Sequence, residues 1–273
     1  IDHMGQWNFL PEHVTMLVLD EADRMLDMGF APQIDKILRF LPKARQTMLF
    51  SATIPKEIIE IAAKHMKLPV SVEIAPSGTM AEHVTQELFI VKKEAKMRLL
   101  GKLLAQYRGP VLLFSRTKHN AKKITRSIRD MGYHAAEIHS NRSLNQRREA
   151  LDGFKSGRYK ILVATDIAAR GIDVTGIEVV INYDLPQDAE NYVHRIGRTG
   201  RAGHSGHAIS FATPDQSRDV RDIEKIIRTP LPISRHPEIS LDKFDAFESH
   251  PQDRQLKRKL PQKNWGRFPK RPR

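Results

Sequence analysis

The sequence has 273 residues, 40% of them apolar and 28% charged, which suits one large or two ordinary folded domains and excludes a wholly disordered chain. It contains no cysteine, which excludes disulfides, iron–sulfur clusters and cysteine-ligated zinc. Because it lacks a long uncharged apolar run and a signal-peptide pattern, we expect a soluble, cytoplasmic protein without membrane contact. The formal net charge of +13 favours a polyanionic partner, with nucleic acid first.

Most of this positive charge lies in a C-terminal tail. Residues 251–273 contain nine Lys or Arg against Asp253 alone, so they carry +8 of the +13. The segment is rich in proline and has no apolar periodicity, so we expect a basic, disordered tail over residues 230–273. Trp265 and Phe268 lie among the cations, as in segments that stack on bases and contact phosphates. A tail that only increases solubility is the alternative.

Short apolar runs in residues 1–74 predict buried parallel strands. Three such runs occur, at residues 16–19, 47–50 and 70–74. A helix with apolar residues at helical spacing is expected after Pro55. These strands are too few for a complete domain, so we expect residues 1–74 to be the second half of one. Residues 75–83, which contain Pro, Ser and Gly without periodicity, are predicted to be a linker.

Strand and helix patterns alternate over residues 84–229, which predicts one complete α/β domain. Its parallel sheet should be covered by helices on both faces. Gly132 is expected to end one helix, and Ser143 with Gln146 forms a capping-box pair that opens the next. The expected strands are residues 88–91, 111–114, 135–138, 161–164, 179–181 and 208–211.

An acidic motif, Asp20-Glu21-Ala22-Asp23, follows the first predicted strand. Ligands of open α/β sheets bind at the carboxyl ends of strands. Adjacent carboxylates at that place can hold a hydrated Mg²⁺ and position a water for attack on a phosphate. A surface turn of solvated acids remains an equally open interpretation of four residues.

A basic motif occupies residues 194–201, where three arginines and a histidine are interrupted by Gly197 and Gly200. Glycines let the backbone approach a ligand closely, and guanidinium groups contact phosphate oxygens in pairs. The pattern therefore favours phosphate recognition over a merely solvated basic surface. Residues 164–173 follow another predicted strand and by themselves are compatible with an ordinary turn.

Four motifs together resemble those of the DEAD-box RNA helicases: DEAD at 20–23, SAT at 51–53, ATDIAARGID at 164–173 and HRIGRTGR at 194–201. They occur in the family's order, and the wording is most similar to the bacterial RhlE-type branch. The resemblance covers roughly residues 1–229. It implies two RecA-like α/β domains, one partial and one complete here, that close on ATP, Mg²⁺ and RNA.

The resemblance also implies roles for the acids and arginines of the motifs. Asp20 would organise Mg²⁺ through water, and Glu21 would position or deprotonate the attacking water. Arg198 and Arg201 would be arginine fingers on the γ-phosphate, and Asp173 would contact the nucleotide.

Further roles concern domain coupling and RNA. The residues that the resemblance implies in interdomain coupling are Asp23, Ser51, Thr53 and His194. Those implied in RNA contact are Phe114, Arg116, Arg147, Thr165 and Arg170. The segment around Arg147 departs from the family pattern at Ser140 and Leu144.

A larger departure is that the 273 residues contain neither a G-x-x-x-x-G-K-[ST] P-loop nor an adenine-reading glutamine motif. Without the P-loop, the phosphates lack their cradle of backbone amides. We therefore expect an N-terminally truncated, monomeric ATP-dependent RNA helicase that remodels short duplexes but hydrolyses little or no ATP by itself. One alternative is an ATP-independent RNA-binding or annealing module made of the second domain and tail. Another is a DNA-directed helicase of the same superfamily.

Overall fold

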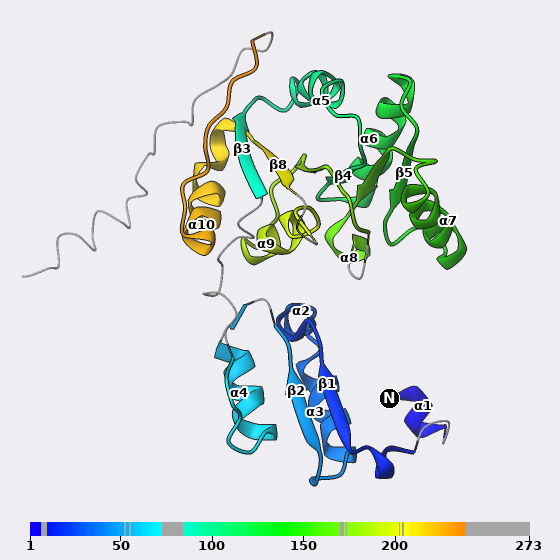
Figure 1. Cartoon of the computed structure of the whole chain (residues 1–273), viewed down its shortest axis with the longest axis vertical. Helices are drawn as coiled ribbons and strands as arrows, with labels where there is room; N and C mark the ends of the chain where they lie inside the picture. Colours follow the sequence, from blue (N-terminus) through cyan, green and yellow to red (C-terminus); the bar gives the residue numbers. More distant parts are fainter. Residues whose placement is uncertain are drawn as a thin grey trace, which may run out of the picture.

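The chain forms two α/β units, each with its own parallel sheet (Figure 1). The computed structural model describes residues 1–6, 10–51, 53–54, 56–72, 84–169, 172, 174–201, 203 and 205–237. The predicted linker, residues 75–83, lies outside the described residues. The two units meet where α2 of the N-terminal unit faces the second unit (Figure 1).

The N-terminal unit is built on a two-stranded parallel sheet, in which Leu17 lies opposite Thr47. The helix over residues 31–40 packs Ile34 and Leu38 into a small core that Leu17 adjoins. Pro32 in the first turn of that helix suits a position where no backbone N–H is required. The elements are α1 (Asp2–Gly5), η1 (Pro11–His13), β1 (Met16–Leu19), α2 (Ala22–Asp27), α3 (Ala31–Phe40), β2 (Gln46–Leu49) and α4 (Lys56–His65).

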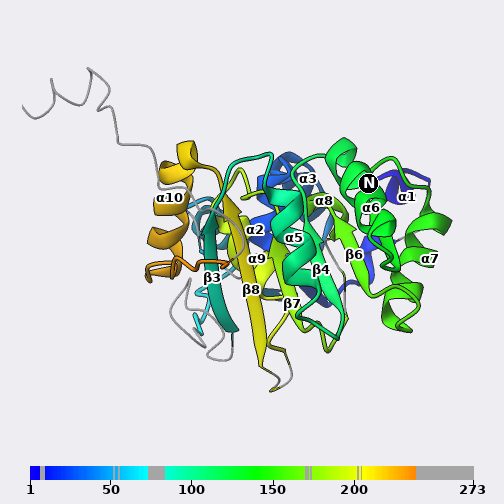
Figure 2. The same cartoon turned by 90° about the horizontal axis from the view of Figure 1, so that it is seen from above.

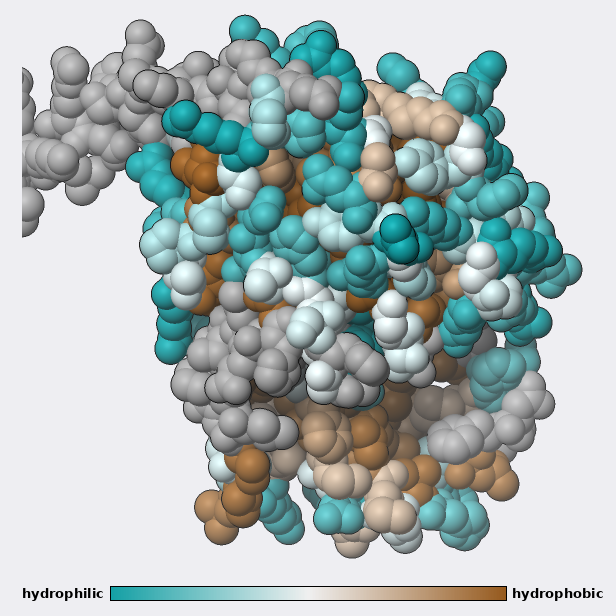
Figure 3. Space-filling model, turned by 45° about the horizontal axis from the view of Figure 1, so that its top comes forward, coloured by the Kyte–Doolittle hydropathy of each residue, from teal (hydrophilic) through white to brown (hydrophobic). Residues whose placement is uncertain are grey.

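This small sheet leaves apolar side chains exposed. Met16 and Val18, on the opposite side of β1 from Leu17, are 64% and 51% exposed. Figure 3 shows apolar residues at the surface of the lower part of the molecule, where the N-terminal unit lies. The strand predicted at residues 70–74 is wrong over residues 70–72. No strand pairs with them there, and Val70 and Val72 stay exposed.

The described residues of the second unit form a parallel sheet of six strands, as the alternating pattern predicts. The order of the strands in this sheet is β3-β8-β7-β4-β6-β5. Its strands are β3 (Val84–Ile90), β4 (Val111–Phe114), β5 (Ala135–Ile138), β6 (Ile161–Ala164), β7 (Val179–Asn182) and β8 (Gly206–Ala212). Its helices are α5 (Lys96–Leu104), α6 (Lys118–Asp130), α7 (Leu144–Lys155), α8 (Asp166–Ala169), α9 (Glu190–Ile196), η2 (Pro214–Gln216) and α10 (Ser217–Ile227).

Helices cover both faces of this sheet, which explains why its strands are apolar throughout. Leu113 of β4 packs with α5 and α6, whereas its neighbour Leu112 packs on the other face with α7 and α8. A further cluster on α9 and α10 covers β3 and β8. Seen from above, α5 crosses in front of the strands (Figure 2). Parallel sheets buried in this way need continuous apolar runs instead of alternation.

The second unit extends beyond the predicted boundary at residue 229. Leu231 is buried, and the Leu88 N–H donates to the Pro232 carbonyl at 2.8 Å. The Ser234 N–H in turn donates to the Leu88 carbonyl at 2.9 Å. These residues add a short parallel bridge beside β3, so the predicted tail begins too early. Residues 238–273 lie outside the described residues. Among the helices that are described, none is both long and apolar enough to span a membrane.

Local signals set the helix ends where the sequence predicts them. Ser143 Oγ accepts from the Gln146 N–H at 3.3 Å, and Gln146 Oε1 accepts from the Ser143 N–H at 3.1 Å. This is the predicted capping box at the start of α7. Gly132, with φ of +89°, follows the end of α6 in the left-handed region that favours glycine.

We predict that Ser143→Ala lowers the free energy of unfolding by about 1 kcal/mol, because the Gln146 N–H loses its acceptor. Ser143→Asp, which restores an acceptor, should stay close to wild type. Urea denaturation followed by circular dichroism measures both. Equal losses in the two variants would contradict the capping role.

Candidate active site

A cavity of about 390 Å³ lies between the two units. Residues at the carboxyl ends of β1 and β2 form one wall, and α9 with the loop that follows it forms the other. The lining residues are Asp20, Glu21, Phe50, Ser51, Val193, His194, Gly197, Arg198 and Arg201. The acidic and basic motifs, far apart in the sequence, therefore face each other.

Parallel pairing brings the acidic motif beside the segment that follows β2. The Ala22 N–H donates to the Phe50 carbonyl at 3.0 Å, which joins the two strand ends. Glu21 has φ of +48° and ψ of +47°, a left-handed conformation that costs a non-glycine residue about 1–2 kcal/mol. Backbone strain of this kind is typical of functional sites, where the surrounding structure maintains it. The Glu21 carboxylate consequently lines the cavity.

Arginines from both units approach Glu21. Arg24 Nη1 lies 3.4 Å from Oε2, and Arg198 Nη2 lies 3.7 Å from Oε1. Arg198 is buried, and its Nη1 donates to the Ile172 carbonyl at 2.9 Å. Burial, together with the positive charges of Arg201 and Arg24, lowers the pKa of Arg198. A guanidinium nevertheless stays protonated at neutral pH. The cavity thus combines a carboxylate with fixed positive charge.

Asp23 does not line this cavity but lies in a buried hydrogen-bond network beside it. Its Oδ2 accepts from both the N–H and the hydroxyl of Thr53, each at 2.8 Å. Ser51 Oγ accepts from the Asp23 N–H at 3.2 Å and donates to the Thr53 carbonyl at 2.6 Å. His194 Nε2 of the second unit lies 3.6 Å from Oδ2, an ion-pair distance. Burial raises the pKa of Asp23, but the contacts with His194 and Thr53 outweigh it and hold that pKa far below its ordinary value.

The four residues predicted to couple the units are therefore brought together. A fifth residue, Glu190, was not predicted. Its Oε2 lies 3.2 Å from Thr53 Oγ1, across the boundary between the units. Glu190 precedes His194 by four residues on α9, so the two side chains share a face. That spacing is the signal in the sequence that could have identified it.

Arg195 was also missed, although it belongs to the basic motif. It is 2% exposed, and its guanidinium holds Asp166 through two bonds of 2.6 and 2.8 Å. Its Nη1 also donates to Asn182 Oδ1 and to the Asp184 carbonyl, at 3.1 and 2.7 Å. Arg195 therefore ties α9 to the carboxyl ends of β6 and β7.

Phe114, which the resemblance implies in RNA contact, has its side chain in the protein interior. Its ring is 2% exposed and lies in the sheet core, with the Arg195 guanidinium 5.0 Å from its centre. As the last residue of a strand buried on both faces, it points into the protein and not from the edge of the sheet.

Other residues predicted to contact RNA lie where strands or helices end. Arg116 is exposed just after β4, and its N–H donates to Asp184 Oδ2 at 3.1 Å. Thr165 follows β6 directly, and its N–H donates to the Ile138 carbonyl at 3.3 Å. Arg147 is half-buried in the first turn of α7. Arg170 and Asp173 lie outside the described residues.

Two family models match the chain. The model described as DEAD/DEAH box helicase matches residues 1–61, and the one described as Helicase conserved C-terminal domain matches residues 95–203. The ATP-dependent RNA helicase DbpA of Bacillus subtilis is 39% identical over 228 residues, which are 83% of this chain and 48% of DbpA. The chain thus spans less than half the length of that curated relative.

Solved structures show the same fold. Saccharomyces cerevisiae Dbp5 bound to RNA and ADP BeF3 is 31% identical, with a TM-score of 0.78 over 85% of this chain and 62% of that one. A Dbp5 variant bound to Nup159, Gle1, IP6 and ADP has the same identity and coverage but a TM-score of 0.55. Escherichia coli DEAD-box protein SrmB, bound to the regulator RraA, is 30% identical with a TM-score of 0.55. That match covers 57% of this chain and 93% of the SrmB chain.

We predict that Asp166→Asn lowers the free energy of unfolding of the second unit by about 3 kcal/mol, because it leaves the buried Arg195 charge without its carboxylate. Arg158→Ala is the matched control, since its pair with Glu149 is exposed and should contribute no more than about 1 kcal/mol. Chemical denaturation measures both variants. Losses of similar size would contradict the role assigned to the buried pair.

Proposed function

Because this chain belongs to the DEAD-box helicase family, we propose that it acts as part of an ATP-dependent RNA helicase. The observation that carries this proposal is the cavity in which Glu21 of one unit faces Arg198 of the other. A carboxylate opposite fixed guanidinium groups is the arrangement that hydrolysis of a phosphoanhydride requires.

The residues that line the cavity fit a nucleotide. Its volume of about 390 Å³ lies in the range of small-molecule sites, roughly 300–1,000 Å³. Arg198 and Arg201 would hold the γ-phosphate, and Asp20 would hold Mg²⁺ through water. Asp173, at the end of the motif at 164–173, would contact the nucleotide. ATP with Mg²⁺ supplies the phosphoryl group and neutralises part of its charge.

The side chains of the chain then have distinct tasks. Glu21 orients the attacking water and accepts its proton. Arg198 and Arg201 stabilise the negative charge that develops during transfer, the role of arginine fingers. Asp23, Ser51, Thr53 and His194 make this arrangement depend on closure of the two units, because their contacts cross or adjoin the boundary.

The relative placement of the two units supports a closed, RNA-bound form. Dbp5 bound to RNA and ADP BeF3 matches this chain with a TM-score of 0.78, against 0.55 for the Dbp5 variant bound to Nup159, Gle1, IP6 and ADP. Both matches cover 85% of this chain, so the difference reflects how the units are arranged. We infer that the cavity closes when nucleotide and RNA are bound.

RNA would bind along the carboxyl edge of the second sheet. Arg116 and Thr165 lie there, Arg147 lies in the first turn of α7, and Arg170 is proposed from the motif alone. A strand bent along this edge would part from its complement, which is how short duplexes would be remodelled. The basic residues 251–273 would add contacts to phosphates.

The residues of the four motifs favour the RhlE-like branch of the family. We propose that the protein acts as a monomer and that it acts in the cytoplasm. The P-loop does not occur in the 273 residues, so catalysis needs one from a further segment. This agrees with the chain spanning 48% of DbpA.

ATP hydrolysis is the decisive test. We expect RNA-stimulated hydrolysis from the chain joined to a P-loop-bearing half-domain of a relative, and little or none from the chain alone, because the phosphates lack a cradle. Hydrolysis by the chain alone would contradict the requirement for the P-loop. Salt-dependent RNA binding without hydrolysis in either form would favour the ATP-independent annealing module.

In the joined protein, Arg201→Ala should lower kcat by about 10³-fold or more, the usual effect of losing an arginine finger. Glu21→Gln should lower it by about 10²–10⁴-fold, because proton acceptance is lost. The exposed Arg218 on α10 provides the control, and Arg218→Ala should retain wild-type turnover. Retained turnover in Arg201→Ala would remove that residue from the mechanism.

A further inference from the structure

The hydroxyl of Thr53 lies between carboxylates of the two units. Its Oγ1 is 2.8 Å from Asp23 Oδ2 and 3.2 Å from Glu190 Oε2. A hydroxyl has one proton to donate, so it can donate to one carboxylate only. The other contact is a hydrogen bond only if that carboxyl group itself carries a proton.

Asp23 is the carboxylate that accepts the hydrogen bond from the Thr53 hydroxyl. Its Oδ2 also accepts from the Thr53 N–H at 2.8 Å, and its Oδ1 accepts from the Arg24 N–H at 2.9 Å. His194 lies on the same side at 3.6 Å. Three donors and a nearby imidazole stabilise the ionised form of Asp23. An ionised Asp23 has no proton with which to donate a hydrogen bond to Thr53 Oγ1.

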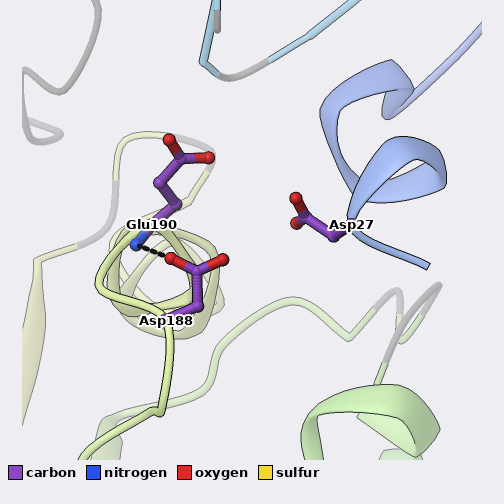
Figure 4. A group of neighbouring side chains, drawn as sticks. All are labelled: Asp27, Asp188 and Glu190. Carbon is purple, nitrogen blue, oxygen red and sulfur yellow. Dashed lines mark hydrogen bonds between the residues drawn. The ribbon is translucent and has the colours of Figure 1, made fainter. Parts of the chain in front are cut away.

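Glu190 faces the lone pairs of Thr53 Oγ1, and other carboxylates surround it. Oxygens of Asp27, Asp188 and Glu190 lie within 4.8 Å of one another. Figure 4 shows Asp27 reaching from α2 toward Asp188 and Glu190, which lie together at the start of α9. Asp188 Oδ1 accepts from the Glu190 N–H at 3.2 Å. Within the part of the chain that the structure describes, an ionised Glu190 would face these carboxylates and a Thr53 oxygen whose proton is donated to Asp23.

We propose that closure of the two units places a proton on the Glu190 carboxyl, which then donates a hydrogen bond to Thr53 Oγ1. Glu190 is a positioning residue that acts through Thr53. The proposal rests on the proposed function, in which closure prepares the site for hydrolysis. The proton comes from solvent, and it returns there when the units separate.

The charged groups that face Glu190 agree with this assignment. Burial raises the pKa of Glu190, and the negative charges of Asp188, Asp27 and Asp23 raise it further. A hydrogen bond donated by Thr53 would lower this pKa, but the Thr53 hydroxyl donates its proton to Asp23. Asp27 and Asp23 belong to α2, so they leave Glu190 when the units part. His194, one turn along α9, faces Asp23.

Closure should depend on pH through Glu190. Because closure raises the pKa of Glu190, protonation of Glu190 contributes fully to closure below the pKa that this residue has in the open form. This contribution is lost as pH rises through the pKa of the closed form. Closure linked to one proton strengthens by at most about tenfold for each unit by which pH falls. His194 also faces Asp23 across the boundary between the units, so a variant is needed to isolate the contribution of Glu190.

The experiment measures closure by energy transfer between dyes on the two units, in the joined protein with a uridine oligonucleotide and ADP–beryllium fluoride. In wild type, closure should weaken as pH rises through the raised pKa of Glu190 in the closed form. The side-chain amide in Glu190→Gln can donate to Thr53 Oγ1 at any pH, because it does not need to take up a proton. We expect it to close more strongly than wild type at pH 8 and to lose one proton from the pH slope. Glu190→Ala should close less than Glu190→Gln, and the exposed-acid control Asp130→Asn should match wild type.

An unchanged pH slope in Glu190→Gln would overturn the proposal, because the pH dependence of closure would then not come from Glu190. Weaker closure of Glu190→Gln than of wild type at pH 8 would overturn it as well. Carbon-13 NMR of the glutamate carboxyls gives an independent readout, since Glu190 should titrate at higher pH once RNA and nucleotide are bound. Absence of ligand-dependent closure in wild type at every pH would instead refute the proposed function.

Discussion

The contact between the two units depends on the buried carboxylate of Asp23. A buried charge is tolerated only when donors satisfy it, and here the donors are the Thr53 N–H and hydroxyl and the Arg24 N–H. These bonds fix the segment after β2 against the first turn of α2. His194 then completes the surroundings of Asp23 from the other unit. The carboxylate therefore joins two strand ends and one domain boundary.

Side chains of α9 and of the turn that follows it contact several different parts of the protein. Glu190 and His194, four residues apart, face Thr53 and Asp23. Arg195, the next residue, turns into the sheet and holds Asp166. Arg198 follows one turn after Arg195 and reaches Glu21. This short helix and the turn that follows it thus carry contacts to the cavity, to the domain boundary and to the segment that follows β6.

The two units differ in how much apolar surface they bury. In the second unit, neighbouring residues such as Leu112 and Leu113 are fully buried on opposite faces of the sheet. In the N-terminal unit, Val18 and Phe50 remain about half exposed. Two strands by themselves give marginal stability, because they offer little surface for a core. The first unit is consequently the one whose order depends more on what packs against it.

The sequence by itself determined the class of fold, the strands of the second unit, the capping box at Ser143 and the motifs that meet at the cavity. Each of these follows from local signals, namely apolar runs, helix-end residues and short motifs. Only the tertiary structure decided that Phe114 is buried, that residues 231–234 join the second unit, and that Glu190 faces Thr53. Burial and contacts across a boundary depend on which elements become neighbours in space. A strand's last side chain and a carboxylate on a helix look alike in sequence whether solvent, a core or another domain faces them.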